Sequence, residues 1–204
     1  MLEAEDIVFS YTKGQKPVLD HVSLSVGPEE RVGILGPSGY GKTTLMKILA
    51  GYQKPDSGRV LLDGKPLPKR GYCPVQMIWQ HPERAMNPRL TLGESLKEAD
   101  NIDRQLEIGL GIEPDWKTRY PQELSGGELQ RFCIARALGQ RTRYLIADEI
   151  STMLDLITQG QIWNFLCLLY TSHYGAAWNG KELESTDRYI PYAPACRTWI
   201  FKHR

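Results

Sequence analysis

The amino-acid sequence predicts an α/β fold with an N-terminal antiparallel β subdomain, a central sheet and a small helical insert. Apolar and polar residues alternate over 3–9 and 20–26, which is the pattern of half-buried antiparallel strands. A short apolar run at 31–35 leads into a glycine-rich loop, after which apolar residues continue at helical spacing. A second apolar run, at 143–147, is typical of a buried strand and ends in two carboxylates.

The other elements are predicted from hydrophobic period and from the Gly, Pro and Asp residues that separate the periodic segments. They are a turn at 13–17 between the first strands, a helix at 42–50 ending at Gly51, strands at 59–62 and 75–79, a turn at Asp63-Gly64, a helical insert at 81–123, and helices at 128–138 and 158–169.

The composition is that of a globular protein and argues against general nucleic-acid binding. The chain has 204 residues, of which 41% are hydrophobic and 24% charged, as in an ordinary globular protein. Its net charge of +1 gives no general attraction to nucleic acid or anionic lipid, so we expect no nucleic-acid partner.

Neither the cysteines nor the N-terminus indicates an extracellular or membrane-spanning protein. Cys73, Cys133, Cys167 and Cys196 form no CxxC pair and have no histidine at ligand spacing, so we expect reduced thiols rather than disulfides or a metal site. The first residues lack the basic and apolar regions of a signal peptide. No apolar run approaches the roughly 20 residues needed to span a bilayer.

A phosphate-binding loop is predicted between the strand at 31–35 and the helix at 42–50. The sequence matches G-x-x-x-x-G-K-[ST], a P-loop, in the strand–loop–helix context that this motif requires. Glycines let backbone N–H groups turn toward phosphate oxygens, and the helix directs the positive end of its dipole at them. The fold class is therefore a P-loop NTPase core. The residues expected to bind nucleotide are Gly36, Pro37, Ser38, Gly39, Gly41, Lys42, Thr43 and Thr44.

Side chains of two segments have distinct predicted roles in ATP hydrolysis. Lys42 would reach the β- and γ-phosphates, Thr43 would bind Mg²⁺, and Thr44 would help to hold the α-phosphate end. At the end of the strand at 143–147, Asp148 would bind Mg²⁺ through water and Glu149 would polarise the attacking water. The alternative for this pair is a solvated acidic strand end.

A second anion site is predicted at Leu124-Ser125-Gly126-Gly127-Glu128. A serine and two glycines at the start of an amphipathic helix offer a hydroxyl, close backbone approach and a positive dipole end. By itself, the segment is equally compatible with a serine-capped helix that follows a glycine turn. Together with the P-loop, it resembles the signature of the ATP-binding subunit of ABC transporters, and the resemblance runs from the N-terminus to about residue 166.

This resemblance implies roles for four further residues. Tyr11 would stack on adenine; the alternative is a strand aromatic packed in the core. Gln80 would couple Mg²⁺ and the attacking water to the helical insert. Asp155 would belong to a loop that crosses a dimer interface, or cap the next helix, and both roles are compatible. His173 would contact the γ-phosphate, but it follows Asp155 closely, and an unrelated surface histidine is an equal alternative.

Two segments, 79–89 and 148–155, resemble the subfamily that serves importers of di- and oligopeptides or of nickel. The resemblance implies ATP and Mg²⁺ as cofactors, and a second ABC ATPase subunit, identical or different, with ATP sandwiched between the two. It also implies transmembrane permease subunits as partners and a location at the cytoplasmic face of the membrane. The alternatives are a soluble ABC ATPase that acts on ribosomes or DNA, and a subunit that binds nucleotide but hydrolyses it poorly.

We predict one ABC-type nucleotide-binding domain over 1–166, with the helical insert at about 81–123, and an atypical tail over 167–204 that is not a separate domain. The tail carries aromatic residues, prolines and charges without a strand or helix period, and we assign it to no sheet. A divergent ending, a truncated paralogue and a shifted reading frame near residue 167 each explain it. The abrupt end of the periodicity slightly favours the third.

Overall fold

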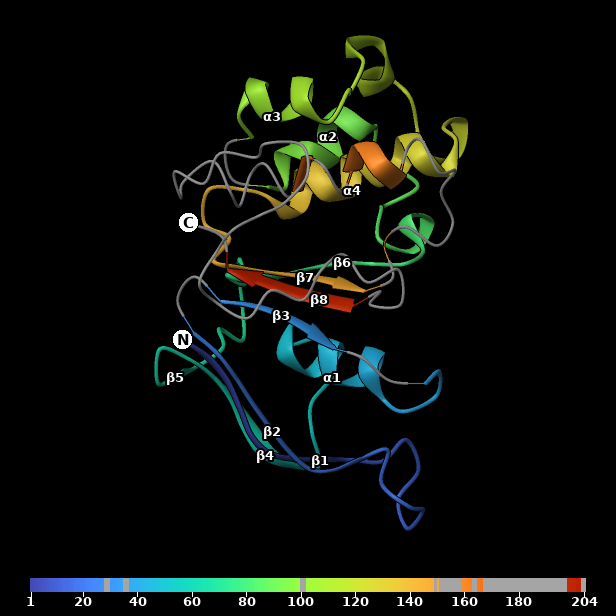
Figure 1. Cartoon of the computed structure of the whole chain (residues 1–204). Helices are drawn as coiled ribbons and strands as arrows, with labels where there is room; N and C mark the ends of the chain where they lie inside the picture. Colours follow the sequence, from blue (N-terminus) through green and yellow to red (C-terminus); the bar gives the residue numbers. More distant parts are fainter. Residues whose placement is uncertain are drawn as a thin grey trace.

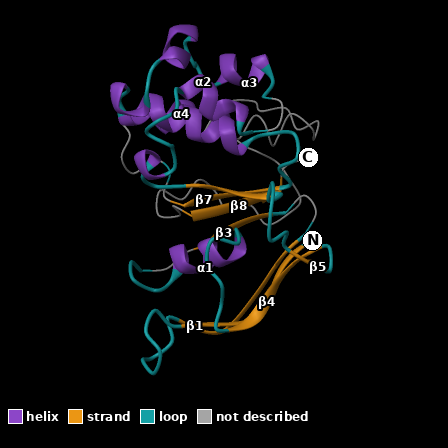
Figure 2. Ribbon diagram, turned by 180° about the vertical axis from the view of Figure 1, so that it is seen from behind, coloured by secondary structure: helices purple, strands orange, loops and turns teal. Residues whose placement is uncertain are grey.

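The computed structural model describes residues 1–27, 30–34, 37–99, 102–148, 150, 159–162, 165–166 and 198–202. In this part of the chain an N-terminal sheet, the helix α1 (Lys42–Leu49), a central sheet and a layer of helices that includes α4 (Gly126–Ala137) are stacked in that order (Figure 1). The view from behind, in Figure 2, also places α1 and α4 on opposite faces of the central sheet. The arrangement is the predicted α/β fold with a β subdomain and a helical insert.

The N-terminal sheet is built from antiparallel pairs, as the alternating pattern predicts. Its inner face is apolar: Leu2 and Ile7 are fully buried and pack in one core with Met46 of α1. The strands, in the order β2-β1-β4-β5, are β1 (Leu2–Phe9), β2 (Leu19–Val26), β4 (Ser57–Leu62) and β5 (Lys65–Pro66).

α1 ends at the glycine that the sequence indicates. Gly51 has a φ of +78°, a left-handed conformation that favours glycine. Its N–H donates to Ile48 O at 3.0 Å, and the N–H of Tyr52 donates to Lys47 O at 2.8 Å. This pair of bonds is a Schellman motif, which satisfies the last carbonyls of the helix.

The central sheet has the order β3-β8-β7-β6. β6 is parallel to β7, whereas β8 is antiparallel to both β3 and β7. β3, β6 and β7 therefore run in one direction, and β8 runs against them. The strands are β3 (Arg31–Ile34), β6 (Val75–Ile78), β7 (Tyr144–Asp148) and β8 (Thr198–Lys202).

β8 lies in the tail over 167–204, which the sequence pattern assigns to no sheet. Ile200, at the centre of β8, is fully buried and is paired with Val32 on one side and Ile146 on the other. The strand has only five residues, too few for a period to be distinguished among the surrounding prolines and charges. The rest of this tail lies outside the described residues.

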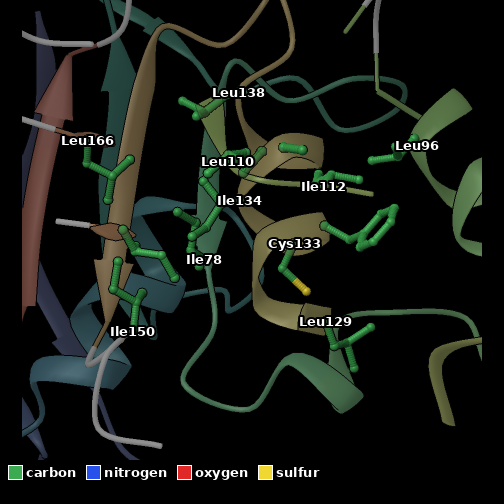
Figure 3. Packing of buried hydrophobic residues seen from close by; sticks show 14 of the residues in the cluster. Ile78, Leu96, Leu110, Ile112, Leu129, Cys133, Ile134, Leu138, Ile150 and Leu166 are labelled. Atoms are coloured by element: carbon green, nitrogen blue, oxygen red, sulfur yellow. The ribbon is translucent and has the colours of Figure 1, made fainter. Parts of the chain in front are cut away.

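The helical insert and α4 share a core with one face of the central sheet. Figure 3 shows Leu129, Cys133 and Ile134 of α4 in the same cluster as Ile78 of β6. The insert consists of η1 (Pro82–Arg84), α2 (Leu92–Lys97), α3 (Arg104–Gly109), η2 (Pro114–Thr118) and η3 (Pro121–Glu123).

Part of the predicted helix at 158–169 is described. Residues 159–162 and 165–166 are helical, and Ile162 and Leu166 are buried in the core next to α4. None of the helices described has the length and apolar character needed to cross a bilayer.

Candidate functional site

The carboxyl ends of β3, β6 and β7 lie at one edge of the central sheet because the three strands are parallel. Thr198 of β8 is paired with Ile34 on one side and with Asp148 on the other, so the ends of β3 and β7 are level. Two strand spacings separate them, which is about 10 Å. This edge therefore brings together the P-loop after β3, Gln80 after β6 and Asp148 at the end of β7.

The P-loop contains two glycines whose conformations other residues rarely adopt. Gly39 has a φ of +85° and open space around it, so glycine is required there for conformation alone. Gly41, with a φ of +83°, is also confined: an added Cβ would lie 3.0 Å from Val18 O and 3.0 Å from Leu19 Cδ2. The loop is thus packed against the start of β2.

Among the described residues, no side chain caps the N-terminus of α1. Its N-cap is Gly41, and its first turn has no acidic residue. By contrast, α2, α3 and α4 begin with side-chain caps from Thr91, Asp103 and Ser125. An N-terminus without a side-chain cap or carboxylate offers N–H groups and a positive dipole end to phosphate.

Lys42 and Thr43 provide the polar side chains at this helix start. The Lys42 Nζ donates to the carbonyl of Pro37 at 2.9 Å, so the side chain folds back across the loop. Thr43 is exposed, with its hydroxyl in the first turn of α1.

Tyr11 lies beside the same helix start. Its hydroxyl and Thr44 Oγ1 form a hydrogen bond of 2.8 Å. The residue is 66% exposed, and its ring meets that of Phe9 edge to face, with 5.0 Å between the ring centroids. Thr44 itself is buried. The structure therefore places an exposed aromatic ring next to the P-loop helix, and it gives the Thr44 hydroxyl a protein partner.

The oxygen donors at the sheet edge fit a Mg²⁺–nucleotide complex. Asp148 is 3% exposed, Gln80 is half-buried, and together with the Thr43 hydroxyl they offer the oxygen ligands that Mg²⁺ prefers. Mg²⁺ is commonly held by one or two carboxylates and completes its coordination with water and phosphate. The described residues contain no cluster of three or more His, Cys, Asp or Glu side chains that could hold a metal ion.

The second predicted anion site is a capped helix N-terminus. Ser125 Oγ accepts the N–H of Glu128 at 3.3 Å, and Glu128 Oε2 accepts the N–H of Ser125 at 2.8 Å, which is a capping box. The Ser125 hydroxyl can still donate its proton to an anion. Gly126 is exposed, and an added Cβ there would meet nothing within 4 Å.

Four predicted site residues, Gly36, Glu149, Asp155 and His173, lie outside the described residues, and their roles stay predictions. The sequence analysis missed Gln130, which is 1% exposed and whose Nε2 donates to the carbonyl of Trp79 at 3.4 Å, directly before Gln80. Its sequence signal is a glutamine at helical spacing from apolar Cys133 and Ile134.

A family model described as "ABC transporter" matches residues 19–152. A nickel import ATP-binding protein NikE of Escherichia coli O6:K15:H31 is 34% identical over 192 residues, covering 81% of this chain and 72% of that protein. A nickel import system ATP-binding protein NikE of Staphylococcus aureus (strain bovine RF122 / ET3-1) is 38% identical over 180 residues, covering 81% and 73%.

Solved structures agree with the fold. A dimeric, post-hydrolysis state of the ATP-binding cassette MJ0796 bound to ADP and Pi is similar with a TM-score of 0.71 at 25% identity, covering 85% of this chain and 84% of that one. CbiO1 from Clostridium perfringens, part of the ABC transporter complex cbiONQ, is similar with a TM-score of 0.63 at 24% identity, covering 84% and 74%. The latter comparison supports the fold alone.

Proposed function

The chain belongs to the ABC transporter family of ATPases, and on that premise we propose that it is the ATP-hydrolysing subunit of a nickel importer. It would pair with a second ATPase subunit and with transmembrane permease subunits at the cytoplasmic face of the membrane. The observation that carries the ATPase part is the sheet edge where the P-loop, Gln80 and Asp148 meet.

The two anion sites of the chain support a paired arrangement. The P-loop begins α1, and Ser125 begins α4, and these helices lie on opposite faces of the central sheet (Figures 1 and 2). Because the sheet separates the two helices, one phosphate group cannot be shared between their N-termini within a chain. A second subunit would supply the Ser125–Gly127 segment to the P-loop of the first, as in the sandwich that the sequence predicts.

The residues at the site can bind ATP and direct its hydrolysis. Lys42 would leave the Pro37 carbonyl to neutralise the phosphate charge, and Tyr11 would cover the adenine with its exposed ring. Thr43, Gln80 and Asp148 would hold Mg²⁺, which neutralises charge that develops on the phosphate oxygens. Glu149 would accept the proton of the attacking water.

The solute is the part of the proposal that rests on the relatives. The resemblance of residues 79–89 and 148–155 is compatible with peptides as well as nickel, and the two relatives described above are nickel import proteins. We therefore propose nickel. This subunit would supply energy without touching the ion.

Glu149→Gln tests the ATPase part. We expect the variant to bind ATP as tightly as the wild type but to turn over at least about a hundredfold more slowly, because general-base catalysis contributes about that factor or more. ATP hydrolysis and the binding of a fluorescent ATP analogue should be measured with and without the permease subunits. Turnover like that of the wild type would remove Glu149 from this role, and binding without hydrolysis by the wild type in both conditions would favour a hydrolysis-impaired subunit.

Uptake assays on the assembled transporter test the proposal that nickel is the transported solute. Cells or vesicles that contain the permease and its solute-binding component should accumulate radioactive nickel with the wild-type chain and not with Glu149→Gln. A dipeptide or oligopeptide label serves as the comparison. Uptake of peptide instead of nickel would leave the ATPase assignment intact and overturn the nickel proposal.

A further inference from the structure

One face of α4 is hydrogen-bonded to the backbone of the segment 79–85. Three donors on the helix are spaced three residues apart, and the three carbonyls that accept from them are also spaced three residues apart. The pairs are Gln130 Nε2 to Trp79 O at 3.4 Å, Cys133 Sγ to Pro82 O at 3.7 Å, and Arg136 Nη2 to Ala85 O at 2.5 Å. We call the donor residues Gln130, Cys133 and Arg136 the α4 ladder.

The α4 ladder is largely withdrawn from water. Gln130 is 1% exposed and Cys133 is 4% exposed; Figure 3 shows Cys133 between Leu129 and Ile134 on the helix. Burial raises the pKa of the Cys133 thiol to about 12, so it keeps its proton as a weak donor at neutral pH. Arg136 is held in turn by Glu98, with 3.3 Å between Nη1 and Oε2.

Packing alone does not explain the glutamine at position 130. Its Oε1 is buried and, among the described residues, has no hydrogen-bond partner. An unpartnered buried oxygen is unfavourable, and a methionine would fill a similar volume without it. The part of the side chain with a defined partner is Nε2, which is bonded to the carbonyl immediately before Gln80.

We propose that the α4 ladder consists of positioning residues that fix the backbone on both sides of Gln80. Gln80 lies between Trp79 and Pro82, whose carbonyls accept from the first two residues of the α4 ladder. The helix that carries the ladder begins at Ser125, so Gln80 is tied to the segment that would meet the partner's nucleotide. This inference rests on the proposed ATPase function only for its catalytic consequence.

Amide hydrogen exchange of the full chain tests the ladder without reference to activity. Gln130→Met removes the donor at nearly constant volume, and we expect exchange across 79–86 to become about fivefold faster while β7 keeps its protection. Arg131→Met is the matched control, since Arg131 on the same helix donates to Leu110 O, outside this segment. Unchanged exchange across 79–86 in Gln130→Met overturns the inference, whether or not the chain hydrolyses ATP.

Steady-state kinetics then test the link to Gln80. Gln130→Met should lower kcat by about tenfold or more with KM for ATP nearly unchanged, since a displaced catalytic group impairs turnover before binding. In a Gln80→Ala background the same substitution should have little further effect, because the residue on which it acts is already absent. An equal loss in both backgrounds would show that Gln130 does not act through Gln80. Absence of wild-type hydrolysis would contradict the proposed function alone, and the exchange experiment would still decide the ladder.

Discussion

At the residue scale, the P-loop combines a closely packed backbone at Gly41 with a lysine, Lys42, that is hydrogen-bonded within the loop. Gly41 has no space for a Cβ against Val18 and Leu19, so the start of α1 keeps its place relative to β2. The Lys42 ammonium is held by the Pro37 carbonyl, a neutral acceptor that a phosphate anion would replace. A phosphate oxygen accepts the same kind of hydrogen bond and adds the attraction between opposite charges, so the exchange favours the nucleotide.

Asp63 gives the first prediction, on the pH dependence of stability. The Met1 ammonium and the Arg143 guanidinium, both bonded to this carboxylate, lower the pKa of Asp63 from 3.8 to about 2. A depressed folded-state pKa stabilises the fold above pH 3.8, and this contribution is lost as the pH falls through about 2. Because the side chain is 44% exposed, screening limits the effect to about 1 kcal/mol.

Asp63→Asn should therefore melt at a lower temperature than the wild type at pH 6, and the difference should vanish on acidification. Thermal unfolding of both proteins between pH 6 and pH 2 measures it. Asp56→Asn is the control, because it also neutralises a carboxylate close to β4, but one that accepts from the Ser10 N–H and not from Arg143. A difference between Asp63→Asn and the wild type that stays constant over this pH range would contradict the assignment.

At the element scale, the sequence predicts the strands and helix ends that are determined by residues close to them in the chain. Alternation identifies β1 and β2 because one face of their sheet covers α1, and Gly51 identifies the end of α1 because only a left-handed residue completes its cap. The observed elements differ from the predicted ones by one or two residues at their ends, where hydrogen bonding rather than hydrophobic period decides. β8 could not be predicted, since its burial depends on the distant strands β3 and β7.

The residues of the candidate site also fall into two groups, those that a local motif predicts and those that depend on long-range packing. The P-loop and the Ser125 segment are continuous motifs and could be found from the sequence. The bond of Gln130 to Trp79 joins residues 51 positions apart and depends on how α4 packs on the end of β6.

Ser125 gives a prediction for α4, because it caps the helix and is also proposed to donate a hydrogen bond to phosphate. Ser125→Ala removes the capping hydroxyl and should destabilise the fold by about 1 kcal/mol. Ser125→Asp keeps a capping oxygen and should retain stability, but its carboxylate would repel the γ-phosphate. Ser125→Asn is the uncharged control for Ser125→Asp.

The measurement is thermal unfolding together with sedimentation of the Glu149→Gln background in ATP. We expect Ser125→Asp to unfold like the wild type and yet to remain monomeric in ATP, whereas Ser125→Asn dimerises more readily. ATP-dependent dimers of Ser125→Asp as abundant as those of the parent would show that Ser125 does not face nucleotide.

At the scale of the whole molecule, β8 sets the spacing of the site. β3 carries the P-loop and β7 ends in Asp148, and in the described sheet the two strands are joined through β8. The distance between the phosphate loop and Asp148, the carboxylate proposed to bind Mg²⁺, thus depends on a strand from the part of the sequence that shows no period. We therefore expect the nucleotide site to keep its geometry only while β8 stays folded in the sheet.

Ile200 tests that requirement, because it is fully buried between Val32 and Ile146. Ile200→Asp would bury a carboxylate without a partner, and we expect the free energy of unfolding to fall by at least about 3 kcal/mol, a large part of the stability of a typical domain. Ile200→Val keeps an apolar strand residue and should cost only about 1 kcal/mol. Urea unfolding followed by circular dichroism measures both variants, and binding of a fluorescent ATP analogue should be lost with the fold in Ile200→Asp and kept in Ile200→Val. If Ile200→Asp unfolded at the same urea concentration as Ile200→Val, β8 would not lie in the centre of the sheet, and the level ends of β3 and β7 would need another strand between them.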